Sequence, residues 1–153
     1  MECLMTSGQL YRMFLSEDPK TIIRRPNCRK FCLDNNIDME INQKAWLIDY
    51  KSFMSTVNPL NFEHHYTLPR MRNLSQCVNL WNSTHRWQKQ MIDKHMVERF
   101  CKDKRVFAYH HGNRWIINYD QLEPLIAEYI EKNYKIKKRR RQKKIKKVSQ
   151  NYA

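Results

Sequence analysis

Residues 97–126 decide the fold, and they read VERFCKDKRVFAYHHGNRWIINYDQLEPLI. The apolar side chains of Val97, Phe100 and Cys101 have the i, i+3, i+4 spacing of one helical face. Asp93 is a suitable N-cap, so the pattern predicts a helix over Lys94–Lys102. Upstream, a scaffold helix is expected over Ser83–Met91, with a further helix over Ser75–Trp81.

The second half of the same stretch predicts a β-hairpin followed by a helix. Val106–Tyr109 has the alternating pattern of a strand. Residues 110–113 join it through a turn at Gly112 to Arg114–Ile117, which is apolar after its first residue. Asn118 or Asp120 then opens a closing helix that directs Leu122 into the core.

The same pattern occurs once more, 69 residues earlier. Eight of the 31 positions from Lys20 to Tyr50 are identical to their counterparts, where average composition gives about two. The first copy contains a helix with Pro26 in its opening turn, a hairpin turned at Asn42-Gln43, and a closing helix capped by Asp49. A scaffold helix near Gln9–Ile23 is interrupted by Pro19. We therefore expect a first unit at 1–58, a linker at 59–69 and a second unit at 70–133.

Charge is divided unevenly among these segments. The chain has 153 residues and a net charge of +14, yet residues 134–153 hold ten basic and no acidic side chains. Residues 1–66 are balanced at eight of each sign, and residues 67–133 hold eleven basic and seven acidic. The segment 134–153 is predicted to be a mobile basic tail or the frayed end of a helix. Its charge indicates a polyanionic partner; a purely solubilising tail is the alternative.

Composition excludes other classes. Only two glycines occur, so a phosphate-binding glycine loop is absent, and no run of about 18 apolar residues suggests a membrane span. Five cysteines without a secretion signal indicate reduced thiols in a cytoplasmic protein. No segment resembles a nucleophile elbow or a protease signature, so we expect no enzyme. Cys28 and Cys32 fit a helical core stripe better than a metal knuckle, and no metal or cofactor is expected.

The order helix, turn, helix, hairpin, helix resembles the winged helix-turn-helix of the excisionase-like and MerR-type DNA-binding domains. The resemblance is carried by residues 97–126 and 29–53, through the apolar helix face, the Gly-x-Arg-aromatic-Ile wing and the Asp-x-Leu that opens the last helix. It implies a mainly α protein with small β-hairpins (α+β), made of two tandem winged helix-turn-helix units and a basic C-terminal tail. It also implies binding to double-stranded DNA, with the protein associated with the nucleoid.

The surfaces expected to contact DNA follow from the predicted core faces. The helices would read the major groove, the hairpins would reach the backbone or the minor groove, and the tail would bind phosphates. Asn42 and Gln43 belong to the first hairpin tip. The expected DNA-binding residues are Arg25, Asn27, Arg29, Lys30, Lys44, Lys94, His95, Arg99, Lys102, His110, His111, Asn113, Arg114, Arg139, Arg140 and Arg141.

Several alternatives stay open at this point. The helix residues can be an ordinary solvated face, and the hairpin residues an ordinary polar tip. Trp46 and Trp115 are expected in the core rather than stacked on bases. The leading function is a transcription regulator, or an architectural factor in recombination or replication, with two units reading two half-sites. The rival is a module that docks a recombinase or a replication protein through the first unit; RNA binding is a third reading.

Overall fold

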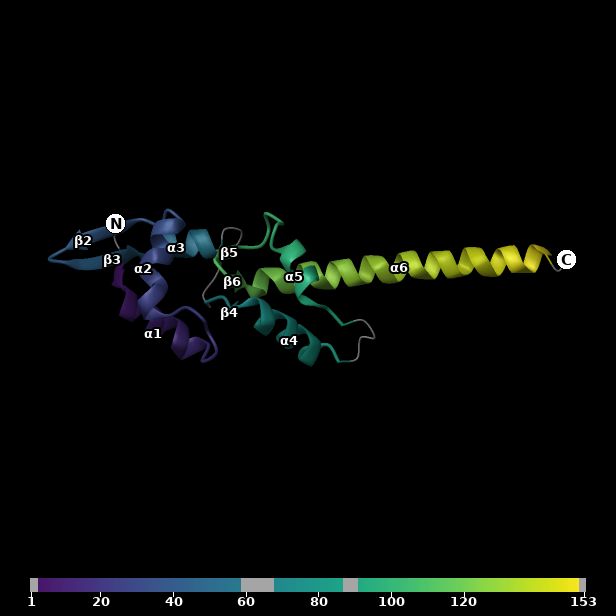
Figure 1. The fold of residues 1–153 in the computed structure, drawn as a ribbon, viewed down its shortest axis with the longest axis horizontal. Coiled ribbons are helices and arrows are strands. Elements are labelled where there is room, and N and C mark those ends of the chain that lie inside the picture. Colours follow the sequence, from purple (N-terminus) through teal and green to yellow (C-terminus); the bar gives the residue numbers. More distant parts are fainter. Residues whose placement is uncertain (1–2, 59–67, 87–90, 152–153) are drawn as a thin grey trace.

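The computed structural model describes residues 3–58, 68–86 and 91–151. They form a mixed α+β structure with two three-stranded antiparallel sheets, which confirms the expected class. In Figure 1 the first unit and the second unit lie side by side along the long axis of the molecule.

The first unit is a strand, two helices, a hairpin and a helix. Its sheet has the order β1-β3-β2. The elements are β1 (Leu4–Thr6), α1 (Ser7–Glu17), α2 (Arg25–Asp34), β2 (Met39–Asn42), β3 (Ala45–Asp49) and α3 (Tyr50–Val57).

The second unit has the same order, and its sheet is β4-β6-β5. The elements are β4 (Met71–Arg72), α4 (Leu74–Thr84), α5 (Lys94–Phe100), β5 (Ala108–His111), β6 (Arg114–Asn118) and α6 (Tyr119–Asn151).

The two units agree in their hydrogen bonds as well as in their elements. The backbone N–H of Asp49 donates to the carbonyl of Asp38 in the first unit, and Asn118 donates to Phe107 in the second. Corresponding residues of the two pairs lie 69 positions apart, which is the offset found in the sequence. α1 and α4 each begin with a capping box, formed by Thr6 with Gln9 and by Asn73 with Gln76. The repeat in the sequence is therefore a repeat in the structure.

α2 ends in a Schellman motif, which sets the path into the hairpin. The N–H of Ile37 donates to the carbonyl of Cys32, and the N–H of Asn36 donates to that of Leu33. Asn36 adopts the left-handed conformation that this motif requires, with φ 55°. Ile37 is buried, so the turn also directs an apolar side chain onto the core.

The two units are docked on each other through apolar and polar contacts. The second sheet packs one face on its own core and presents Phe107, Tyr109 and Ile116 to the core of the first unit. Phe31 of α2 meets the rings of Phe107 and Tyr109 edge to face, with centroids 5.8 and 5.2 Å apart.

Buried polar groups fix this contact further. The Arg72 guanidinium of β4 binds the Asp18 carboxylate at the end of α1, with Nη2 and Oδ1 2.8 Å apart. The side-chain amide of Asn118 donates to the carbonyl of Val57 at 2.8 Å. The orientation of one unit on the other is thus specified by hydrogen bonds as well as by apolar area.

Phe31 and Phe100 occupy equivalent positions but are covered differently. Phe31 is covered by the second sheet, whereas Phe100 meets Tyr129 of α6 edge to face at 5.5 Å. The outward face of the first sheet carries Asp38 and Glu40 where the second carries Phe107 and Tyr109. These acidic side chains distinguish the outward face of the first sheet from the apolar face that covers α2.

Several expectations about local structure are wrong. The scaffold helix is α4, which ends at Thr84, and His85, Arg86 and Met91 are not helical; residues 87–90 of the expected helix lie outside the described part. The helix expected over Ser75–Trp81 lies within α4. Residues 59–67 of the expected linker are not described.

The basic tail is not a separate or frayed segment. α6 continues without interruption from Tyr119 to Asn151, and Figure 1 shows its C-terminal half projecting away from both units. Every side chain from Tyr134 to Val148 is exposed. In the described part of the chain, no helix combines the length and the apolar character that a membrane crossing requires.

Candidate nucleic-acid interface

α5 presents an exposed cationic face. The Asp93 carboxylate accepts the N–H of Met96 at 2.9 Å and starts the helix, and Met96 and Val97 are buried against the second core. The opposite face exposes Lys94, His95 and Arg99; the helix ends at Phe100, earlier than expected, so the exposed Lys102 lies in the turn that follows it. None of these four forms an ion pair or a side-chain hydrogen bond with another described residue.

α2 has the expected buried face but a different exposed one. Cys28, Phe31 and Cys32 are buried, while Arg25, Arg29 and Lys30 are exposed. The side chain of Asn27 lies outside the described residues. Arg29 and Lys30 already have partners: the Arg29 guanidinium stacks 3.5 Å from the centre of the Trp46 ring, and Lys30 Nζ lies 3.4 Å from Asp34 Oδ2. α2 therefore offers fewer uncommitted cations than α5.

Trp46 and Trp115 are both half-buried. Trp115 packs against the second core, as expected, whereas Trp46 belongs to neither core cluster, which corrects the expectation for that residue. Each lies two residues before the isoleucine that fills the core, Ile48 or Ile117, and a polar group covers each ring. Arg29 covers Trp46, and His110 stacks on Trp115 with centroids 4.1 Å apart.

The second hairpin turns at Gly112, as the sequence predicts, whereas the turn of the first hairpin lies one residue later than expected. His110 and His111 belong to β5, and the turn is Gly112-Asn113. In the first unit Asn42 ends β2, and the turn is Gln43-Lys44. The antiparallel register pairs His110 with Trp115 and His111 with Arg114, so both histidines belong to the ladder and not to the turn.

A groove of about 910 Å³ runs between the two units, and we call it the inter-unit groove. It brings together six of the expected residues, Lys30, Lys94, His110, His111, Asn113 and Arg114. Arg24 adds a further cation from the first unit. Of the described residues that line the groove, only Glu98 is acidic.

Tyr109 and Asp34 form a hydrogen bond across the unit boundary beside this groove. The bond from Tyr109, together with nearby Lys30, lowers the pKa of the Asp34 carboxyl. Partial burial and the same bond raise the pKa of the Tyr109 hydroxyl to about 12. The pair thus holds a neutral phenol against an ionised carboxylate at neutral pH, so Tyr109 adds no negative charge to the groove.

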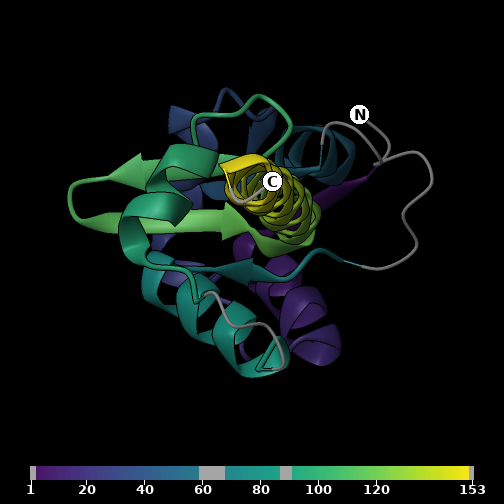
Figure 2. The same ribbon diagram turned by 90° about the vertical axis from the view of Figure 1, so that its right-hand side faces the viewer.

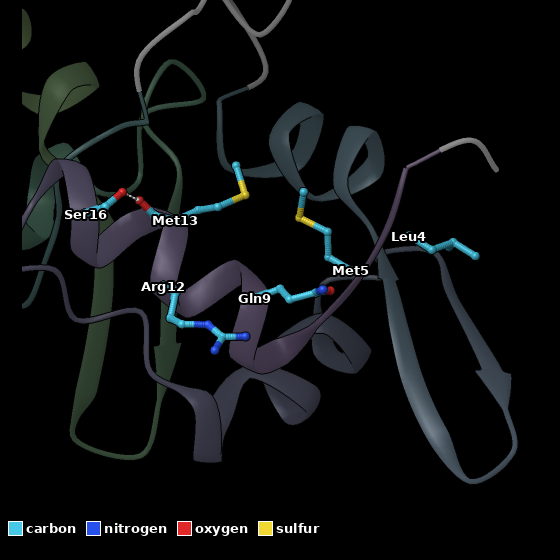
Figure 3. Close-up of a pocket in the computed structure, with 6 residues that line it drawn as sticks. All are labelled: Leu4, Met5, Gln9, Arg12, Met13 and Ser16. Atoms are coloured by element: carbon cyan, nitrogen blue, oxygen red, sulfur yellow. Dashed lines mark hydrogen bonds between the residues drawn. The ribbon is translucent and has the colours of Figure 1, made fainter.

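Two other hollows contain fewer of the expected residues. One of about 270 Å³ lies in the first unit beside Trp46 and is lined by Arg25 and Arg29. Figure 3 shows the other hollow, which lies between β1 and α1. Met5 and Met13 point toward each other there, and the Ser16 hydroxyl donates to the carbonyl of Met13. Of the described residues that line this second hollow, only Arg12 is charged, so it contains no acid–base pair.

The remaining expected residues are exposed but lie elsewhere. Lys44 is at the tip of the β2–β3 hairpin, and Arg139, Arg140 and Arg141 are on the projecting half of α6. These two regions are at opposite ends of the molecule in Figure 1. Figure 2 shows the green β5–β6 hairpin extending sideways from the axis of α6. The two hairpins therefore point in different directions, unlike the wings of a symmetric dimer.

The cysteines of α2 face the core. Cys28 and Cys32 are buried one turn apart, and the contact with Cys28 together with burial raises the pKa of the Cys32 thiol. The described residues contain no group of three or more His, Cys, Asp or Glu side chains that could hold a metal ion.

Sequence reasoning missed Arg24, Tyr109 and Asp34 as parts of this region. The signal for Tyr109 was present, because Phe107 and Tyr109 alternate with Ala108 and so place aromatic rings on the outward face of a strand. Arg24 gave no such signal, since its position depends on how the units dock.

Comparison of the chain with protein-family models, with curated proteins and with solved structures finds no match.

Proposed function

We propose that the protein binds duplex DNA as two tandem winged helix-turn-helix units, with α5 as the main reading helix. The observation that carries the proposal is the exposed face of α5 beside the β5–β6 hairpin, with Lys94 and Arg114 lining one groove. A helix of this kind presents arginine to base edges in the major groove, while lysines hold phosphates. The hairpin then lies against the neighbouring backbone as a wing.

α6 contributes nonspecific affinity in this role. Its projecting half carries the ten basic residues of 134–153 with no acidic residue among them. Helix geometry turns these charges in all directions around the axis, so the segment is suited to phosphates rather than to one set of base edges. The role is that of a transcription regulator or an accessory factor in recombination or replication, acting at the nucleoid.

The experiment is a salt series of fluorescence anisotropy on a labelled duplex. In Lys94→Gln/Arg99→Gln we expect the slope of log affinity against log salt to fall by roughly 0.9, for the phosphate contact of Lys94, and the preference for one duplex sequence to weaken, for the base contact of Arg99. A matched control, Lys20→Gln/Arg12→Gln, removes the same charges from exposed positions of the first unit. Absence of duplex binding at low salt in the unaltered protein would refute the proposal.

A second candidate is protein docking through the first unit, with DNA bound only by the second unit and α6. The observation that favours it is the exposure of Leu33 and Ile41, which are 52% and 60% exposed. The second unit carries Lys102 and His110 at these positions, so the first unit is apolar where the second is basic. The partner expected from the sequence is a recombinase or a replication protein.

Arg25→Glu separates the two candidates. Arg25 is the exposed cation of α2 that forms neither the Trp46 stack nor the Asp34 ion pair. Reversing its charge weakens duplex binding if α2 reads DNA. An unchanged affinity assigns the first unit to protein docking.

A further inference from the structure

We propose that the inter-unit groove holds a single sugar–phosphate strand of the bound duplex, so that both units grip one continuous stretch of DNA. This inference rests on the proposed function and goes beyond it, because tandem units would otherwise be expected to read two separate half-sites.

The distribution of charge in the groove carries the first step. Arg24 and Lys30 come from the first unit, and Lys94 and Arg114 come from the second. Glu98 is the acidic residue in the described lining that opposes these four cations. Asp34 lies beside the groove and is already bound by Tyr109 and Lys30. A cavity of about 910 Å³ with cations on both walls is large enough for more than a single ion and suits a polyanion that runs between the walls.

The apolar lining of the groove carries the second step. Phe31, Tyr109, Trp115 and Ile116 lie among the cations. Deoxyribose rings alternate with phosphates along a strand and provide the apolar surface that meets such side chains. His111 and Asn113 add hydrogen-bonding groups near the hairpin tip for phosphate oxygens.

The rigidity of the docking carries the third step. Phe31 packs on the second sheet and Arg72 binds Asp18, so the two walls of the groove are held at one separation. A preformed groove binds a strand without the cost of ordering two units at the moment of contact. The two hairpins also point in different directions, which does not suit two equivalent half-sites (Figures 1 and 2).

The test uses the full chain and a fluorescein-labelled duplex of about 12 base pairs, just over one helical turn and too short for two half-sites a turn apart. Arg24→Gln alters the first wall and Arg114→Gln alters the second. The matched controls are Arg12→Gln and Arg86→Gln, one exposed arginine in each unit that does not line the groove.

Each groove variant is expected to weaken binding about tenfold and to lower the salt slope by about 0.9, and each control about twofold or less. Arg24→Lys and Arg114→Lys should restore most of the affinity, which a loss of folding would not allow. Glu98→Gln should tighten binding, because it removes the one acidic side chain of the lining that faces the strand.

The outcomes separate this inference from the proposed function. If Arg24→Gln behaves like Arg12→Gln on the short duplex while Arg114→Gln weakens binding, the shared groove is wrong and DNA binding by the second unit stands. If the unlabelled single strand competes as well as the duplex, the occupant is single-stranded and the inference is overturned. If the unaltered chain binds no duplex at low salt, the proposed function fails as well.

Discussion

Arg72 and Asp18 form a buried ion pair between the two units, with side chains only 7% and 11% exposed. In the other unit Met5 takes the ladder position of Arg72, and His85 takes the helix-capping position of Asp18, so neither residue of the pair is repeated. Arg72 also donates to the carbonyl of Met71 at 2.9 Å, and the N–H of Ile22 donates to the same carbonyl at 3.3 Å. The docking of two similar units thus depends on residues in which the units differ.

Breaking this pair should destabilise the protein strongly. Arg72→Met leaves the Asp18 carboxylate buried without its partner, and the expected loss is about 3–5 kcal/mol of the free energy of unfolding, measured by urea denaturation. The double variant Arg72→Met/Asp18→Asn should recover part of the loss, because no buried charge then remains. A loss below about 1 kcal/mol in the single variant would mean that the pair is open to water.

The Tyr109–Asp34 bond predicts a loss of stability in alkali. The pKa of Tyr109 is raised from its ordinary value near 10 to about 12, so the neutral phenol favours the folded state. Its contribution is complete below pH 10 and is lost as the pH rises toward 12. Urea denaturation between pH 9 and pH 12 should therefore show a smaller decline for Tyr109→Phe than for the unaltered protein.

The contribution of Asp34 to stability changes with pH in the opposite direction. The pKa of Asp34 is lowered in the folded state, so its contribution is present above its ordinary value near 4 and is lost as the pH falls below it. Parallel curves for Tyr109→Phe and the unaltered protein at both extremes would contradict the assignment.

The first hairpin turn should be improvable. Gln43 and Lys44 both adopt left-handed backbone conformations, with φ 47° and 70°, which suit Asn-Gly far better. The double variant Gln43→Asn/Lys44→Gly should raise the free energy of unfolding by about 1 kcal/mol.

The second hairpin supplies the reverse control. Gly112 has φ 59°, and an added Cβ would meet no atom within 4 Å, so Gly112→Ala tests the backbone conformation alone. It should lower stability by about 1 kcal/mol. No change in either hairpin would show that the turns relax to other conformations.

α6 should divide into a structural part and a projecting part. Tyr129 and Ile130 pack against the second core, whereas Tyr134–Val148 are exposed. A chain ending at Asn133 should keep the free energy of unfolding within about 0.5 kcal/mol, while one ending at Glu128 uncovers Phe100 and should lose about 2 kcal/mol or more. Equal losses in the two truncations, measured by thermal and urea denaturation, would contradict this division.

Local patterns in the sequence predicted the elements that depend on neighbouring residues. The helix of Lys94, the helix of Pro26, both hairpins and the caps Asp93 and Asp49 are found in the structure. The first scaffold helix lies where it was expected and ends before Pro19, whereas the second was misplaced because charged and polar residues at 83–91 resemble a surface helix. The capping-box spacings Thr6–Gln9 and Asn73–Gln76 were the overlooked signals of their true start.

The candidate interface was only partly predictable. The exposed face of α5 followed from helical periodicity, since the buried side fixes the opposite side. The burial of Trp46 was misjudged, because apolar neighbours in the sequence do not reveal which part of a strand lies over the core. The Lys30–Asp34 ion pair could have been expected from its i,i+4 spacing on one helix, whereas the stacking of Arg29 on Trp46 depends on how the helix packs on the hairpin.

The sequence by itself determined the duplication, the order of elements in each unit and the concentration of charge in residues 134–153. These are properties of neighbouring residues and of spacing along the chain. Only the tertiary structure decided that Phe31 packs on Phe107 and Tyr109, that Arg72 meets Asp18, and that cations from both units line one groove. Such contacts join residues about 50 to 80 positions apart, and they depend on complementary shape and charge between surfaces that assemble only when both units are folded.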